Sequence, residues 1–203
     1  MNDLNKRRVL NVGGNNKAIK IPDYYNRFEH LLVDIDAGVN PDILIDAREL
    51  STLEPQQFDA VYCSHNLEHF FAHDVAKVLG GFQHVLKADG FAEIRVPDLK
   101  ALMRHLVEND LDLDDVLYKT KVGHPITARD VFYGWGKEIE SSGVDFYAHK
   151  TGFSQKTLQK ALNQAGFSFV VFRPGRVLEI YALAFVDRPT TFHQELLGLN
   201  LDN

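Results

Sequence analysis

The sequence of 203 residues has few of the features that mark secreted, membrane-spanning or disulfide-bonded proteins. Its one cysteine, Cys63, cannot form an internal disulfide. No apolar run approaches the roughly 20 residues that span a bilayer. The N-terminal stretch Met-Asn-Asp-Leu-Asn-Lys-Arg-Arg also lacks the apolar segment of a signal peptide. We therefore expect a chain without a membrane span that resides in the cytoplasm.

The composition also lacks an excess of positive charge, internal repeats and low-complexity stretches. Because the net charge is -6, nucleic acid and anionic membranes are not the expected partners. Hydrophobic residues make up 45% and charged residues 25%, a mixture typical of globular proteins. The length suits a single core, so we predict one domain over residues 1–189 and a peripheral tail over residues 190–203. The sequence gives no indication of the oligomeric state.

Short apolar runs alternate with helical patterns along most of the chain, which is typical of an α/β fold. Helices are expected after Asp74, Asp98 and Ser154, because each of these residues can cap an amphipathic helix. The Arg-Pro-Gly-Arg link between the last two strands is too short for a crossover helix, so this pair should be antiparallel. We predict a mostly parallel sheet with an antiparallel last strand and helices on both faces. The expected strands are 8–12, 31–35, 43–45, 59–63, 91–96, 167–172 and 177–186.

Residues 109–151 interrupt this alternation with a long, irregular and aromatic segment. Long segments of this kind inside a compact domain are usually functional or disordered. Its aromatic content argues against disorder, so we predict a lid or acceptor-binding insertion. The aromatic residues are Tyr118, Phe132, Tyr133, Trp135, Phe146 and Tyr147.

Residues suited to binding a nucleoside follow the first three strands, where open α/β sheets bind their ligands. Gly13 and Gly14 would let the backbone approach a ligand closely. Asp34 could accept both hydroxyl protons of a ribose, and Ile35 could cover an adenine ring. Asp46 could accept a hydrogen bond from the adenine amino group. Taken singly, each of these residues is also compatible with an ordinary turn or helix cap.

The order and spacing of three motifs strengthen the prediction of a ligand site. The segments are Asp-Ala-Arg-Glu-Leu from residue 46, Phe-Asp-Ala-Val-Tyr-Cys-Ser-His-Asn-Leu-Glu-His-Phe from residue 58, and Val-Leu-Lys-Ala-Asp-Gly-Phe-Ala-Glu-Ile-Arg-Val-Pro from residue 85. This order resembles the class I S-adenosylmethionine (SAM)-dependent methyltransferases, especially those acting on small molecules, lipids and glycans. That family has an acidic residue after the third strand, a strand ending in Leu-Glu-His, and a Leu-Lys-x-x-Gly turn.

The resemblance implies a Rossmann-like, seven-stranded sheet, SAM as cofactor and S-adenosylhomocysteine (SAH) as product. It implies transfer of a methyl group to an oxygen or nitrogen atom of a small-molecule, sugar or lipid-linked acceptor. His65 and His149 are the predicted catalytic residues, since proton removal from the acceptor calls for a base. The predicted cofactor-binding residues are Gly13, Gly14, Asn15, Asp34, Ile35, Asp46, Ala47, Ser64 and His65.

The first loop departs from the family's acid-x-Gly-x-Gly-x-Gly pattern. Asn11 stands at the acidic position, only Gly13 matches, and Asn15 and Lys17 replace the other glycines. The 16 residues Asn15 to His30 also show poor helical periodicity where the family has a helix. We expect SAM to be bound in an altered manner; the alternative is a SAM-fold module that has lost catalysis and serves binding or assembly. A nucleotide-binding oxidoreductase would require a fuller G-x-G-x-x-G motif.

The segment His65-Asn66-Leu67-Glu68-His69 also matches the H-x-x-E-H pattern of inverted zinc proteases, and His73 extends its spacing. Such a protease needs the pair within a helix and a third ligand elsewhere. Here the pair begins at the end of a strand, and the methyltransferase pattern accounts for Leu-Glu-His without a metal. We therefore expect no metal, with Glu68 and His69 bonded to the backbone or to each other.

Overall fold

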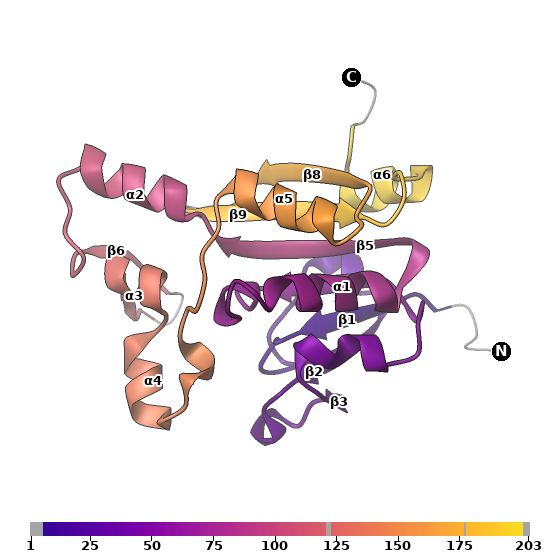
Figure 1. The fold of residues 1–203 in the computed structure, drawn as a ribbon, viewed down its shortest axis with the longest axis horizontal. Helices are drawn as coiled ribbons and strands as arrows, with labels where there is room; N and C mark the ends of the chain where they lie inside the picture. The colour runs from indigo at the N-terminus through magenta and orange to yellow at the C-terminus, as the bar shows by residue number, and fades with distance from the viewer. Residues whose placement is uncertain (1–5, 121–122, 177, 201–203) are drawn as a thin grey trace.

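The computed structural model describes residues 6–120, 123–176 and 178–200, and is built on a seven-stranded sheet of order β3-β2-β1-β4-β5-β9-β8 (Figure 1). β9 runs antiparallel to both of its neighbours, and the strand pairs from β3 to β5 are parallel. The predicted mostly parallel sheet with an antiparallel last strand is therefore confirmed. Val177, the first residue of the strand predicted over 177–186, lies outside the described residues. The strands are β1 (Arg8–Val12), β2 (Glu29–Asp34), β3 (Ile43–Leu44), β4 (Phe58–Ser64), β5 (Leu86–Pro97), β8 (Phe169–Pro174) and β9 (Glu179–Phe185).

The three expected helices are present as α1 (Val75–Val85), α2 (Leu99–Glu108) and α5 (Gln155–Gln164). Ser154 caps α5 in a capping box, and the Asp98 carboxylate accepts a hydrogen bond from the Ala101 N–H at 3.0 Å. Asp74 precedes α1 as expected but makes no side-chain cap. Its carboxylate instead accepts a hydrogen bond from Lys77 at 2.9 Å.

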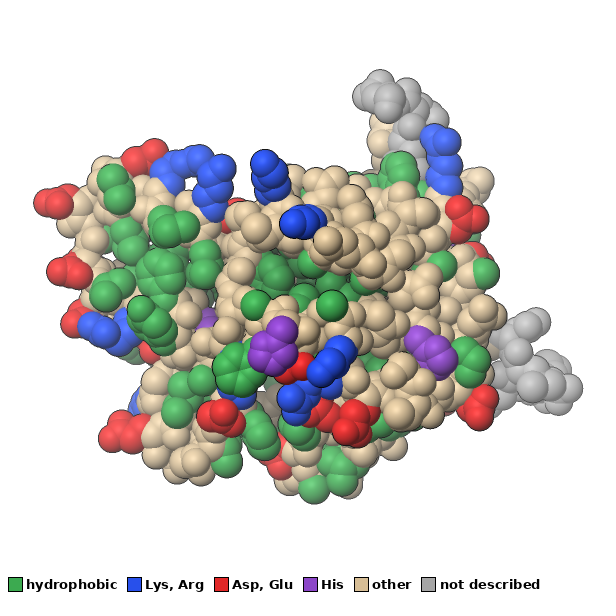
Figure 2. All heavy atoms as spheres, in the orientation of Figure 1, with side chains coloured by type: hydrophobic (Ala, Val, Ile, Leu, Met, Phe, Trp, Pro, Cys, Tyr) green, Lys and Arg blue, Asp and Glu red, His purple; other side chains and the backbone are tan. Residues whose placement is uncertain are grey.

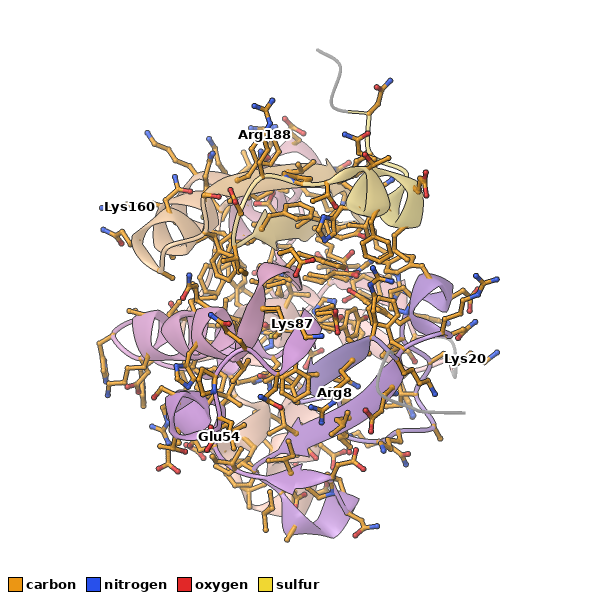
Figure 3. All side chains as sticks on the ribbon, turned by 90° about the vertical axis from the view of Figure 1, so that its right-hand side faces the viewer. Arg8, Lys20, Glu54, Lys87, Lys160 and Arg188 are labelled. Atoms are coloured by element: carbon orange, nitrogen blue, oxygen red, sulfur yellow. The ribbon has the colours of Figure 1, made fainter. Side chains whose placement is uncertain are left out.

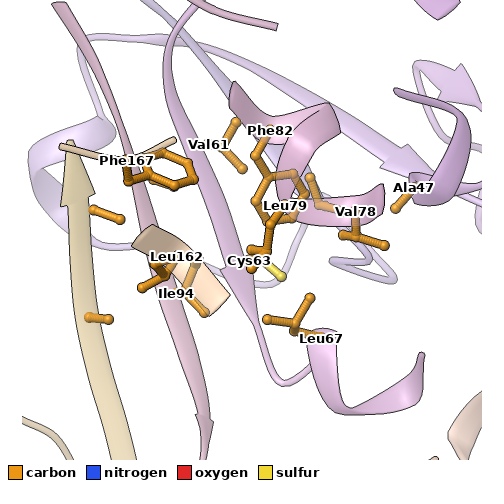
Figure 4. Close-up of a cluster of buried hydrophobic side chains, with 14 of the residues drawn as sticks. Ala47, Val61, Cys63, Leu67, Val78, Leu79, Phe82, Ile94, Leu162 and Phe167 are labelled. Carbon is orange, nitrogen blue, oxygen red and sulfur yellow. The ribbon is translucent and has the colours of Figure 1, made fainter. Parts of the chain in front are cut away.

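α1 and α5 cover one face of the sheet, and their apolar side chains form the larger core (Figure 1). Val78, Leu79 and Phe82 of α1 pack toward Val61 and Cys63 of β4 (Figure 4). All five side chains are fully buried. Truncating a buried phenylalanine to alanine typically lowers the free energy of unfolding by about 3–5 kcal/mol. The apolar side chains that the periodicity of α1 places on one face therefore stabilise the fold.

The opposite face of the sheet has no long helix between β1 and β2. The connection holds only a single 3-10 turn, η1 (Asp23–Tyr25), as the poor periodicity indicated. The C-terminal α6 (Thr191–Leu197) completes this face, and Leu197 joins Phe91 and Phe185 in a second core. One side of α6 thus packs into the core, whereas a peripheral tail was expected over 190–203; residues 201–203 lie outside the described residues.

The amino ends of the strands form a charged edge away from the ligand-binding end of the sheet. The Asp59 carboxylate accepts hydrogen bonds from the backbone N–H of Arg8 at 2.8 Å and from Lys87 Nζ at 2.9 Å. Arg8 and Lys87 lie near each other in the view of Figure 3. This pairing ties the starts of β1, β4 and β5 together, leaving their carboxyl ends to build the site.

The insertion predicted over 109–151 forms a separate group of short elements beside the sheet, at the left of Figure 1. Leu102 of α2 packs with Ala128 and Val131 in a small third core. Figure 2 shows hydrophobic side chains gathered between acidic ones at this end of the molecule. None of the described helices is long and apolar enough to cross a bilayer. The elements are β6 (Val116–Lys119), β7 (Pro125–Thr127), α3 (Ala128–Tyr133), α4 (Gly136–Ser142) and the 3-10 turn η5 (Asp145–Tyr147).

Candidate active site

A cavity of about 460 Å³ lies beyond the carboxyl ends of β1, β2 and β4. This volume falls within the range of pockets that hold small molecules and cofactors. Residues from the strand ends form one wall, and residues from η5 and the segment after it form another. The strand-end wall includes Gly13, Asn15, Asp34, Ile35, Asp46 and His65, and the insertion wall consists of Asp145, Phe146, Tyr147 and Lys150.

Asp34, the last residue of β2, connects two loops of the cavity. One carboxylate oxygen accepts a hydrogen bond from the Asn15 N–H at 3.2 Å, and the other accepts one from the Asp36 N–H at 3.1 Å. Each carboxylate oxygen has two acceptor positions, so both can still accept a ligand hydroxyl. The carboxylate is thus oriented and remains free to bind a diol.

The loop after β1 uses its two glycines to make room for two asparagine side chains. Gly13 has a φ of 65°, and a β-carbon there would lie 2.0 Å from Asn66 Nδ2. A β-carbon on Gly14 would lie 2.2 Å from Nδ2 of the buried Asn11. Asn11, at the position that is acidic in the family, thus packs under the loop. Asn66 lies over it and lines the cavity.

Asp46 caps the 3-10 turn η3 (Ala47–Thr52) and is heavily bonded to Arg48. Its carboxylate accepts hydrogen bonds from the Arg48 backbone N–H at 2.9 Å and from the guanidinium at 2.6 Å. Burial alone would raise the pKa of Asp46, but these hydrogen bonds outweigh it and lower the pKa. The Arg48 guanidinium also lies 3.5 Å from the Asp74 carboxylate, so it bridges Asp46 and Asp74 at the cavity wall.

His65 follows β4 with a φ of 51°, a left-handed conformation that few residues other than glycine adopt. Its Nε2 lies 3.0 Å from Glu179 Oε1, and its Nδ1 lies 3.5 Å from Glu68 Oε1. Burial alone would lower the pKa of His65, but the two carboxylates outweigh it and raise the pKa to about 9. At neutral pH this imidazole therefore keeps its proton, which suits a hydrogen-bond donor better than a general base.

The insertion is fastened to the strand ends by main-chain hydrogen bonds. The Glu68 carbonyl, in the 3-10 turn η4 (Leu67–His69), accepts hydrogen bonds from the N–H groups of Lys150 at 2.8 Å and Thr151 at 3.1 Å. Gly134 pairs with Ala148 across the base of the insertion. These bonds bring the residues just before position 150 against the Leu-Glu-His segment.

Two histidines and a glutamate meet at this junction. One possible ligand atom from each of Glu68, His69 and His149 lies within 4.8 Å of the other two. The Glu68 side chain is 1% exposed, and neither of its carboxylate oxygens has a hydrogen-bond partner among the described residues. Burial lowers the pKa of His149, so its ring is neutral at pH 7. From the sequence, Glu68 was expected to bond to the backbone or to His69, and His149 was not foreseen as its neighbour because about 80 residues separate the two.

Comparison with known proteins agrees with this geometry. A family model described as a methyltransferase domain matches residues 23–94, the stretch that contains Asp34, Asp46 and the Leu-Glu-His segment. This part of the chain is therefore similar to a methyltransferase domain. No curated protein matches the chain significantly in sequence.

Solved structures share the fold of this chain at low sequence identity. A SAM-dependent methyltransferase from Archaeoglobus fulgidus is 16% identical with a TM-score of 0.55, covering 89% of this chain and 86% of its own. One from Thermotoga maritima is 16% identical with a TM-score of 0.52, covering 91% and 84%. The carbon methyltransferase CurJ is 12% identical with a TM-score of 0.55; the match covers 93% of this chain and 50% of CurJ. At these identities the comparison establishes the fold alone.

The residues of the cavity fit a SAM molecule. Asp34 has two oriented carboxylate oxygens that could accept hydrogen bonds from the ribose. The buried Asn66 Oδ1, beside Gly13, has no partner among the described residues and can accept a hydrogen bond from a ligand ammonium group. Asp46 fits less well, because Arg48 already occupies its carboxylate.

The structure separates the predicted site residues into two groups. Gly13, Asn15, Asp34, Ile35, Asp46 and His65 line the main cavity, and Ala47 lines a pocket of about 50 Å³ beside it. Gly14, Ser64 and His149 do not line either cavity, and His149 lies instead against Glu68. Their roles in binding and catalysis stay predictions. Asn66, Arg48 and Lys150 also line the cavity and were not predicted, although Asn66 and Arg48 lie within the segments that carry the resemblance.

Proposed function

We propose that this chain transfers the methyl group of SAM to an oxygen or nitrogen atom of a small-molecule, sugar or lipid-linked acceptor. The observation that carries this proposal is the single cavity with two chemically distinct walls. The strand-end wall offers Asp34 and Ile35 to a nucleoside. The insertion wall offers Phe146, Tyr147 and Lys150, a mixture of apolar and polar groups suited to a small acceptor.

SAM supplies the activated methyl group, so the protein has chiefly to position the acceptor and accept its proton. At the junction between the strand ends and the insertion, His69 and His149 each have a nitrogen available to accept a proton. The Nδ1 of His69 donates a hydrogen bond to the Ala148 carbonyl at 3.0 Å, and that of His149 donates one to the Val131 carbonyl at 2.9 Å. Their Nε2 atoms are therefore unprotonated in the neutral rings. The unprotonated Nε2 of His149 supports its predicted role as the catalytic base. His65 would instead orient the neighbouring Glu68 and Glu179 carboxylates.

One observation favours the second candidate, a SAM-fold module that has lost catalysis. Arg48 occupies the Asp46 carboxylate, and Asn66 packs on Gly13, so the adenine and methionine ends of the cofactor site both carry groups that a ligand must displace or bond to. Such a module would bind a protein partner or hold SAM without turnover.

The test is a methyl-transfer assay with isotopically labelled SAM and a panel of alcohols, phenols, amines, sugars and lipid-linked glycans. We expect label in one acceptor class together with stoichiometric SAH. Phe146→Ala should then raise the KM for that acceptor more than the KM for SAM. Calorimetric binding of SAM without SAH formation from any member of the panel would favour the non-catalytic module.

A further inference from the structure

The Glu68 carboxylate is buried without a direct hydrogen bond, which is unusual for a charged side chain. Its side chain is 1% exposed, and both oxygens lack hydrogen-bond partners among the described residues. Leaving an ionised carboxylate buried and unbonded costs several kcal/mol, so such groups normally pair with a charge or coordinate a metal. His65 Nδ1 is 3.5 Å from Oε1, so the protonated ring offsets part of the cost of burial but is too far away for a good hydrogen bond. Both carboxylate oxygens therefore remain able to bond directly to a further positive partner.

His69 and His149 each have an unprotonated ring nitrogen in the neutral form, and both rings lie close to the Glu68 carboxylate. The Nδ1 atom of each ring donates to a backbone carbonyl, and this fixes both the tautomer and the ring orientation. The same arrangement holds histidines that ligate metals, where the second nitrogen is bonded to a carbonyl or carboxylate. The two rings are close, with centroids 4.9 Å apart at an interplanar angle of 67°.

The distances suit a metal centre with small adjustments. His149 Nε2 lies 4.0 Å from Glu68 Oε1, and the three candidate ligand atoms lie within 4.8 Å of one another. Ligand atoms around a tetrahedral zinc are roughly 3.3–3.6 Å apart, given metal–ligand bonds of about 2.0–2.2 Å. The three ligand atoms must therefore draw closer when a cation binds, and the hydrogen bonds from Lys150 and Thr151 to the Glu68 carbonyl already hold the two segments together.

We propose that Glu68, His69 and His149 bind one divalent transition-metal cation, Zn²⁺ in the first place, beside the cofactor cavity. Two histidines and one glutamate form a ligand set found in catalytic zinc sites, which keep a further position open. His69 lines the cavity, so this open position can take a hydroxyl oxygen of the acceptor. The cation would then lower the pKa of that hydroxyl in place of a general base. Only this role toward the acceptor rests on the proposed methyl transfer; the cation site itself does not.

Titration calorimetry of the chelator-treated chain with ZnCl2, in the absence of SAM, tests the site directly. We expect binding of one Zn²⁺ per chain. Glu68→Gln and His149→Gln should each weaken it at least about tenfold, since each removes a ligand. The matched control is His73→Ala, which removes an exposed histidine of the same segment and should leave the affinity unchanged. Absence of stoichiometric binding, or equal affinity in all variants, would overturn the proposal.

Two further measurements keep the result decisive if a variant of the buried Glu68 fails to fold. Co²⁺ added to the wild-type chain should give the d–d absorption of a nitrogen- and oxygen-ligated site, and Zn²⁺ should abolish it; no absorption overturns the proposal. A separate titration with SAH reports on the cofactor site. SAH binding without Zn²⁺ binding would reject the cation site and support the proposed methyltransferase function. Zn²⁺ binding without SAH binding would support the cation site and reject the proposed methyltransferase function.

Discussion

The carboxylate of Asp34 accepts a hydrogen bond from the backbone N–H of Asn15 and thereby joins the end of β2 to the loop after β1. Asp34→Ala removes this bond and the proposed acceptor of the ribose hydroxyls. We expect the Kd for SAM to rise at least about tenfold, because a hydrogen bond to a charged group is worth about 1.5–3 kcal/mol. Titration calorimetry with SAM measures the change.

The control for this substitution is Asp23→Ala, which removes an exposed acid of η1 outside the cavity. It should leave the Kd unchanged. Equal affinities of wild type and Asp34→Ala would mean that the nucleoside lies elsewhere.

Gly14→Ala should destabilise the fold by about 1–3 kcal/mol, the usual cost of overpacking. The new β-carbon would lie 2.2 Å from Asn11 Nδ2, and Asn11 is 2% exposed and has no room to move outward. Urea unfolding measures the effect. Gly80→Ala in α1 provides the contrast, since nothing lies within 4 Å of its β-carbon and alanine favours a helix by about 0.5–1 kcal/mol. Two stabilised variants would contradict the packing around Asn11.

Gly134→Ala should loosen the insertion from the cavity. Gly134 has a φ of 92°, and a β-carbon there would lie 2.0 Å from the Tyr147 carbonyl oxygen. Because Phe146 and Tyr147 line the cavity, we expect faster proteolysis within 118–147 and a SAM Kd raised about tenfold, equivalent to about 1.4 kcal/mol. Limited proteolysis and calorimetry measure these effects. Gly136→Ala, whose β-carbon would have no contact closer than 3.9 Å, should behave as wild type.

Acid should weaken the packing of α6 through His193. The Thr190 N–H donates to His193 Nδ1 at 3.0 Å, so this nitrogen must be unprotonated, and burial lowers the pKa of His193. The unfolded state, with a pKa of about 6.5, binds the proton first. The free energy of unfolding therefore falls as the pH drops below about 6.5.

Urea unfolding at pH 7.5 and 5.5 measures this dependence. His193→Gln should show a smaller loss between the two pH values than wild type. An identical loss in both proteins would assign the dependence to other groups.

The positions of the strands along the chain could be predicted because each apolar run is short and bounded by turn residues, as Arg8–Val12 is by Gly13. The antiparallel last strand followed from the four-residue Arg-Pro-Gly-Arg link alone. Asp98 and Ser154 also cap their helices as expected, since a cap is a local interaction. These features depend on contacts between residues close in sequence.

Most features that could not be predicted depend on residues far apart in the chain. His149 meets Glu68 only because Lys150 and Thr151 bond to the Glu68 backbone. Arg48 and Asp46 are neighbours in sequence, but their contact depends on a side-chain rotamer that no motif specifies. The residues after Pro189 were expected to form a peripheral tail because the sequence does not show which face of the sheet receives their apolar side chains.

The packing of α6 has a consequence for how the chain folds as it is synthesised. Tyr25, Phe91 and Phe185 share their core with Leu197, so one face of the sheet stays uncovered until the last helix has emerged from the ribosome. Exposed apolar strand surface of this kind promotes aggregation during folding. The nascent chain must therefore be shielded from other chains until Leu197 has docked on this face.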